Sequence, residues 1–379
     1  MKISTAASLV LFVVCMCGAA SADAQNTQSE RVWWYTLEEG KLLFRSGDYG
    51  NALVTFDKAR RTRHAQFTRL EQDLIRLLST AEARTLGDSL FSIERLISFR
   101  NETAAAAALD YLFHRVSRES VGGSAARVLE ELERQKNFPE ADFWMGETFM
   151  AEGELALALT QYQRAWDNRA LLETPGFDVQ ILYCMTTIRQ MRQEYIEMER
   201  LASQIITGDS PGHNRDNLWA SGLLRAAMVR LLESEGIHRF ISLYRHDNIV
   251  TERAHRLLGF FFTDTRRDIS AAEHLMFAFL IQNTIIIDDI IRRQFDFTFT
   301  TLDDLMTHAL VQPALVEFME ETEYFRTAFH LSTALASTGK TIPAMQLWAF
   351  LAASPNAGVW GERARANPVP YSEPAIELP

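Results

Sequence analysis

Cysteine is scarce in this chain. Among 379 residues only Cys15, Cys17 and Cys184 carry a thiol, and the first two lie within the first two dozen residues. If that N-terminal stretch is removed, Cys184 is left alone, so it forms no disulfide within the chain and no cysteine metal cluster. We expect Cys184 to act as a small apolar side chain inside a helix, and the fold to be stabilised by packing alone.

Basic charge is also in deficit. Lys and Arg number 38 against 49 Asp and Glu, so the formal net charge is −11. Binding to nucleic acid phosphates needs a basic surface, and we therefore expect no nucleic acid among the partners. The short basic run at residues 58–63 is predicted to be the solvated C-terminal end of a helix, where positive charge complements the helix dipole.

Long apolar runs are missing as well, so no segment is a comfortable membrane span. Residues 1–24 instead resemble a signal peptide, with Lys2 before a short apolar run and small-residue cleavage sites before Asp23 and Gln25. Lipid attachment at Cys15 or Cys17 is the alternative, although neither follows a small residue. We expect an exported protein of the periplasm, and peripheral association with a membrane stays open.

Proline is absent between the signal peptide and Pro139, and later prolines are widely spaced until the C-terminal end. That spacing suits helices of about one to two dozen residues. Strand patterns are weak, the best being residues 295–301, whereas apolar residues recur every three and four residues at 70–78 and 223–231. The predicted fold class is all-α.

Two stretches of the chain share five residues at identical spacing. They are Gly40, Gly47, Ala52, Phe56 and Ala59 in the first stretch, and Gly146, Gly153, Ala158, Tyr162 and Ala165 in the second. Two further stretches keep part of the pattern: Gly259 with Ala271, Leu275 and Ala278, and Gly339 with Ala344 and Trp348. We interpret the first glycine as a close crossing of two helices, and the second as the end of the first helix.

This pattern resembles the tetratricopeptide repeat, a helix-turn-helix unit of about 34 residues. The resemblance implies a right-handed superhelical array, and the distances of 106 and 113 residues between Gly40, Gly146 and Gly259 imply about eight to ten helix pairs. Degenerate pairs are expected at residues 65–99, 102–136, 178–207 and 216–247. The predicted domains are a signal peptide (1–24), N-terminal repeats (30–170), degenerate C-terminal repeats (171–355) and a Pro-rich tail (356–379).

The resemblance also implies a concave binding face, lined by the first helix of each pair. The residues expected there are Trp34, Leu37, Lys41, Phe44, Arg45, Phe143, Glu147 and Met150, with Arg326, Phe329 and Thr333 in the last unit. For the aromatic residues, packing against a neighbouring helix is an equal alternative. The Lys and Asn pairs that hold C-terminal carboxylates in cytosolic relatives of the family are absent from these positions.

Catalytic signatures are weak. Glu252 and His255 have a spacing that places two metal ligands on one helix face, but no second copy of the pair occurs, which favours a surface pair. Asp303 and Asp304 follow two threonines, as acids at a helix start do. We therefore predict no enzyme and no cofactor. The expected function is a scaffold for another protein or peptide, and the alternatives are an accessory solute-binding component of a transporter and a cell-wall enzyme.

Overall fold

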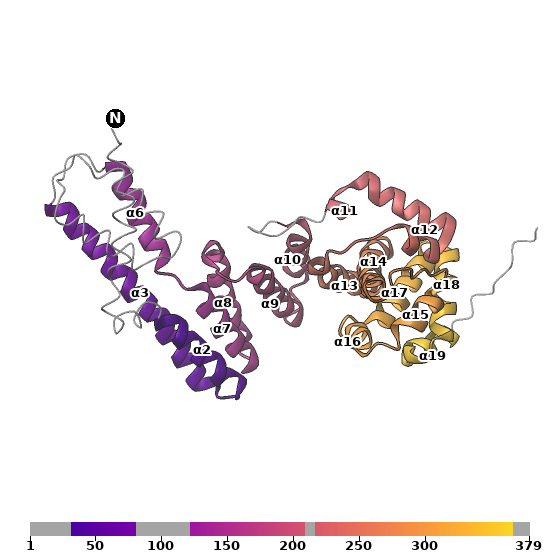
Figure 1. Ribbon diagram of the computed structural model, residues 1–379, viewed down its shortest axis with the longest axis horizontal. Coiled ribbons are helices and arrows are strands. Elements are labelled where there is room, and N and C mark those ends of the chain that lie inside the picture. The colour runs from indigo at the N-terminus through magenta and orange to yellow at the C-terminus, as the bar shows by residue number, and fades with distance from the viewer. Residues whose placement is uncertain (1–31, 81–121, 209–216, 367–379) are drawn as a thin grey trace, which may run out of the picture. The chain divides into compact units, whose positions relative to one another are not determined.

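The computed structural model describes residues 32–80, 122–208 and 217–366, and every regular element within these ranges is a helix (Figure 1). The chain divides into two compact units, Met1–Thr174 and Pro175–Pro379, which are treated separately below. The predicted signal peptide and the end of the predicted tail lie outside the described residues, as does most of the pair expected at 65–99.

The first unit contains five α-helices in its described residues: α2 (Val32–Arg45), α3 (Tyr49–Thr80), α6 (Gly122–Gln135), α7 (Pro139–Ala151) and α8 (Leu155–Asp167). A short 3-10 turn, η4 (Arg169–Leu171), ends it. Helices α2 and α3 form one antiparallel pair, α7 and α8 form another, and α3 packs between α2, α6 and α7.

The helices of the second unit begin with α9 (Phe177–Met191), α10 (Tyr195–Thr207), α11 (Asn217–Ala220) and α12 (Gly222–Leu243). They continue with α13 (Ile249–Asp264), α14 (Asp268–Arg293), α15 (Leu302–Ala309) and α16 (Pro313–Glu321). The last are α17 (Tyr324–Ser337), α18 (Thr341–Ala353), the 3-10 turn η5 (Pro355–Ala357) and α19 (Val359–Ala366).

One turn closes five of the helix pairs. The central residue of this turn has a backbone in the left-handed region, with positive φ. The φ values are 82° at Gly47, 81° at Gly153, 59° at Gln193, 56° at Arg266 and 81° at Gly339. Each turn repeats the same backbone bonds, for example Gly47 N to Phe44 O at 3.0 Å and Asp48 N to Leu43 O at 3.0 Å. These bonds define a Schellman end of the first helix, as predicted at Gly47 and Gly153.

The two helices of a pair cross where the first one carries a glycine. A Cβ atom on Gly146 would lie 2.7 Å from the ring of Tyr162, and one on Gly259 would lie 2.5 Å from Leu275. A Cβ atom on Gly40 would likewise lie 2.5 Å from the ring of Phe56. The prediction of a close crossing at these glycines is confirmed, and the large residue sixteen positions later fills the space.

The pairs of the second unit stack so that their turns share one edge. Tyr195, at the start of α10, stacks on Phe261 near the end of α13 at 5.2 Å. Phe260 of α13 contacts His330 of α17 at 5.1 Å, and Arg256 binds Glu323 at the start of α17 at 2.7 Å. Helices α13 and α17 are therefore parallel, and the turns at Arg266 and Gly339 lie on the same side.

Two predictions around α3 are wrong. Residues 65–80 do not begin a new pair, because α3 continues unbroken through 32 residues that hold no proline and no glycine after Gly50. The basic run at 58–63 consequently lies within this helix and not at its end. Arg63 is 1% exposed, and it donates to the backbone oxygen of Gln135 at 2.9 Å.

Other expectations met different outcomes. The strand candidate at 295–301 is a loop between α14 and α15. The first part of the predicted tail, 356–379, is ordered as α19, which packs against α18. Asp304 does begin a helix as expected, since its backbone N–H donates to the Thr301 hydroxyl at 3.2 Å.

Among the described residues, α14 is the one helix whose length and apolar character would suffice to cross a membrane. Within its most apolar stretch, 78% is buried in the structure. Helix α14 contacts both α13 and α17, so the protein itself supplies the apolar surroundings that this helix needs. Its composition is that of a central core helix.

Candidate binding surfaces

The first helices of the two pairs in the first unit present a common surface, here named the α2/α7 face. Its centre is Trp144 of α7, whose ring lies 5.6 Å from Phe44 of α2 in an edge-to-face arrangement. The ammonium of Lys41 lies 5.5 Å from the Trp144 ring centroid, within the range of a cation–π contact. Trp144, Phe44 and Lys41 are all half-buried, so each keeps part of its surface exposed.

The structure distributes the eight predicted binding residues over core and surface. Trp34, Lys41, Phe44, Glu147 and Met150 are half-buried and Arg45 is exposed. Leu37 and Phe143, however, are 0% and 2% exposed. These two side chains point into the core, and the prediction that they contact a partner is corrected, because a side chain without exposed area offers none to a ligand.

Sequence reasoning missed Trp144. It lies three residues before Glu147, and side chains at that spacing are neighbours on a helix surface. That spacing could have revealed it. Glu147 itself is tied to the pair interior, since it accepts a hydrogen bond from the Tyr162 hydroxyl at 2.5 Å. The partly exposed part of the α2/α7 face therefore consists mainly of Trp34, Lys41, Phe44, Trp144 and Met150.

In the second unit, the three predicted residues on α17 are engaged with neighbours. Arg326 donates to Glu323 at 2.5 Å and lies over the Phe260 ring at 4.2 Å. Phe329 packs 5.4 Å from Trp360 of α19. Thr333 donates back to the Phe329 carbonyl at 3.0 Å. These contacts favour the packing interpretation for Phe329.

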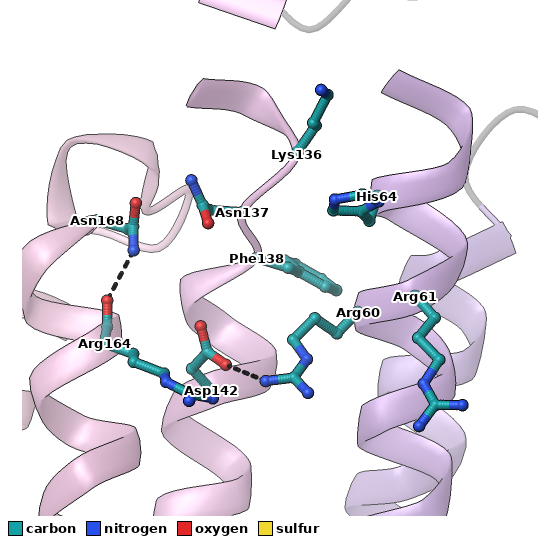
Figure 2. Close-up of a pocket in the computed structure, with 9 residues that line it drawn as sticks. All are labelled: Arg60, Arg61, His64, Lys136, Asn137, Phe138, Asp142, Arg164 and Asn168. Carbon is teal, nitrogen blue, oxygen red and sulfur yellow. Dashed lines mark hydrogen bonds and ion pairs between the residues drawn. The ribbon is translucent and has the colours of Figure 1, made fainter. Parts of the chain in front are cut away.

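A separate pocket of about 480 Å³ opens in the first unit. Nine residues line it: Arg60, Arg61 and His64 from α3, Lys136, Asn137 and Phe138 between α6 and α7, Asp142 from α7, Arg164 from α8, and Asn168 just after it. Four of them are Lys or Arg and one is an acid. We name this the basic pocket (Figure 2).

Asp142 lies between two arginines in the basic pocket. Figure 2 shows Arg60 and Arg164 reaching toward it from α3 and α8, and the Arg60 guanidinium meets its carboxylate at 3.3 Å. Burial raises the pKa of Asp142 to about 6, although Arg60 and Arg164 oppose that rise. The carboxyl group is thus held where its charged form is poorly solvated.

Glu252 and His255 do not form a surface pair as predicted, because both are buried. Glu252 accepts a hydrogen bond from Gln282 at 2.7 Å and pairs with Arg256 at 3.0 Å. The His255 Nδ1 lies 3.0 Å from the Nδ1 of His274, under the ring of Trp219. Within the described ranges no three His, Cys, Asp or Glu side chains gather as a metal site would require.

Comparisons with known proteins add a relative but no function. No family model matches the chain, and no solved structure matches it. The chain is 26% identical over 332 residues to an uncharacterized protein of Treponema pallidum (strain Nichols). The matched region covers 86% of this chain and 88% of the relative.

Proposed function

We propose that this chain is an exported scaffold of the tetratricopeptide type, which binds another protein or a peptide in the cell envelope. Its helix pairs would stack as a right-handed superhelix, as in that family. Five pairs with the same turn support the proposal, together with the crossing glycines Gly40, Gly146 and Gly259. Stacked helix pairs of this kind present extended surfaces that suit protein partners.

The α2/α7 face is the observation that carries the proposal. It combines half-exposed aromatic side chains, Phe44 and Trp144, with the cation of Lys41 and the exposed Arg45. Aromatic residues and arginine are enriched at the centres of protein interfaces, where they supply most of the binding energy. A mixed apolar and charged surface between two helices suits an extended peptide or an amphipathic helix.

Site-specific photo-crosslinking in the native host tests this proposal. A photoreactive amino acid at Arg45 or Met150 should capture one defined partner, while the same amino acid at Val54, which is 68% exposed on α3, should not. Lys41→Glu should then weaken the crosslink at Met150 without changing the melting temperature. Equal capture at Val54, or no capture at either face position, would contradict the scaffold.

Export has its own measurement. Mass spectrometry of the mature protein should find an N-terminus at Asp23 or Gln25, in agreement with the predicted cleavage sites. A lipid on Cys17 would instead identify an anchored protein. An intact Met1 in the envelope fraction, or a wholly cytosolic location, would contradict export.

An accessory role in solute handling is the second candidate, and the basic pocket favours it. Its volume of about 480 Å³ falls within the range of roughly 300–1,000 Å³ that is usual for small-molecule sites. Native mass spectrometry of protein purified from its own host should reveal a co-purified small molecule. Its absence from every charge state would count against this candidate.

A further inference from the structure

The basic pocket concentrates positive charge in a protein whose net charge is strongly negative. Its lining holds Arg60, Arg61, Lys136 and Arg164 against the single acid Asp142, in a chain with a net charge of −11. Two helices, α3 and α8, and the segment between α6 and α7 contribute these cations. The cluster is therefore a product of the fold, and it is not one run of the sequence.

Three of the four cations, Arg60, Arg61 and Lys136, also pair with acids outside the pocket lining. Lys136 binds Glu71 at 2.7 Å, and Arg61 binds Asp57 at 2.6 Å, yet neither acid belongs to the pocket lining. Such pairs fix the positions of the cations and restrict their side-chain motion.

Arg164 is the most available of the four cations. It is exposed, and in the described part of the chain it forms no ion pair, although its charge acts on Asp142. The side-chain amides of Asn137 and Asn168 lie near Arg164 (Figure 2), and each donates one N–H to a backbone carbonyl, which leaves its second N–H for a ligand. Guanidinium groups and amides together are the donors that bind phosphate and carboxylate oxygens best.

We propose that the basic pocket binds a small, multiply charged oxyanion, carrying phosphate or carboxylate groups, through Arg60, Arg164 and Lys136. Arg60 and Arg164 hold opposite sides of the anion, and Asp142 limits its affinity by occupying part of the same positive field. The proposal deepens the second candidate function and is independent of the scaffold. No bond is made or broken in this step.

Calorimetry on the purified mature chain tests the proposal with pyrophosphate and citrate as probes and glucose as the uncharged control. We expect one of the two anions to bind with a Kd below about 1 mM, and the affinity to fall steeply when salt is raised to about 0.5 M. Binding of pyrophosphate alone assigns a phosphate ligand, and binding of citrate alone assigns a polycarboxylate. Failure of both anions overturns the proposal, whatever the outcome of the crosslinking.

Variants locate the binding. Arg164→Gln should weaken it by about tenfold or more, the usual effect of losing one charge-assisted contact. Arg200→Gln, on the exposed side of α10 in the second unit, is the matched control and should bind as the unaltered chain does. Asp142→Asn removes the one acid of the lining and should tighten binding. Unchanged affinity in Arg164→Gln, with the melting temperature preserved, would overturn the assignment to this pocket.

Discussion

The two units build the same turn from different residues. In the first unit the left-handed residue is glycine both times, at Gly47 and Gly153. In the second unit it is Gln193, Arg266 and then Gly339, with the same set of backbone hydrogen bonds. A left-handed residue other than glycine costs roughly 1–2 kcal/mol, so packing of the following helices must offset that cost. The packed helix pair therefore determines the turn, and glycine only lowers the conformational free energy that the turn costs.

The crossing position differs in the same way. Three pairs place glycine there and a large side chain sixteen residues later, as in Gly146 and Tyr162. In the α9/α10 pair the equivalent residues are Thr186 and Ala202, both buried. In this pair the larger of the two residues lies on the first helix, whereas in the three glycine-containing pairs it lies on the second. The two residues at a crossing differ in identity from pair to pair, but one of them is always small enough to accommodate the other.

The largest effect is expected from disturbing that complementarity. Gly259→Ala should lower the free energy of unfolding by about 1–3 kcal/mol, because its Cβ would lie 2.5 Å from the Leu275 side chain. Adding Leu275→Ala should recover part of the loss, so that the double variant is less destabilised than the two single changes together. Urea unfolding of the four proteins measures this coupling.

Gly50→Ala is the matched control for that series. No atom lies within 4 Å of a Cβ at Gly50, and its backbone φ is not positive. Alanine is favoured over glycine in a helix by about 1 kcal/mol, so this change should be neutral or stabilising. If the losses in free energy of unfolding caused by Gly259→Ala and Leu275→Ala were simply additive, the claim that these two residues are complementary in size would be contradicted.

The two units should respond oppositely to acid. Burial raises the pKa of Asp142 to about 6, so its contribution favours the folded first unit below its unfolded pKa and is lost as the pH rises through about 6. Burial, together with Arg326, lowers the pKa of His330 in the second unit to about 4. That contribution is present above the unfolded pKa and is lost as the pH falls through about 4.

Between neutral pH and about pH 5 the second unit should therefore lose on the order of 1 kcal/mol relative to the first. Hydrogen exchange in peptides from α7 and from α17 measures the two units separately. His330→Phe should reduce the loss in α17, and the remainder is expected from His274 and His238, whose pKa values burial also lowers. Asp142→Asn should flatten the response in α7. Parallel responses of both units in the unaltered chain would contradict the assignment.

The smallest effect is expected at the third residue after the turn. This position holds Gly50 and Ala156 in the first unit, but Ile196, Ile269 and Ile342 in the second, where they are 85%, 69% and 51% exposed. Serine in place of any of these isoleucines should change stability by no more than about 0.5 kcal/mol. A larger loss in thermal melting would show that the isoleucines pack against something.

The sequence was most informative where two stretches shared identical residues. The spacing of Gly40 and Gly47, repeated at Gly146 and Gly153, predicted both the crossings and the turns that the structure shows. The pair formed by α9 and α10 lacked such a signature, since Gln193 replaces the turn glycine. Its turn is specified by backbone bonds and packing, which leave little trace in residue identity.

The basic pocket could not be predicted from the chain. Arg60, Lys136 and Arg164 are far apart in sequence, and only the packing of α3 against α6 and α7, and of α7 against α8, brings them together. The basic run at 58–63 was visible, but its extent within one long helix was not, because no residue there marks a helix end. The α2/α7 face was predicted in part, and Trp144 completes it.

Exchanging residues between the glycine turns and the non-glycine turns tests most directly whether the five helix pairs are copies of one structural motif. Gly153→Arg should lower the free energy of unfolding of its unit by roughly 1–2 kcal/mol. Arg266→Gly should raise that of the other unit by up to about 1 kcal/mol, since the positive φ of 56° no longer strains a side chain. Hydrogen exchange in the flanking helices reports each change. Destabilisation by Arg266→Gly, or tolerance of Gly153→Arg, would contradict the equivalence of the turns.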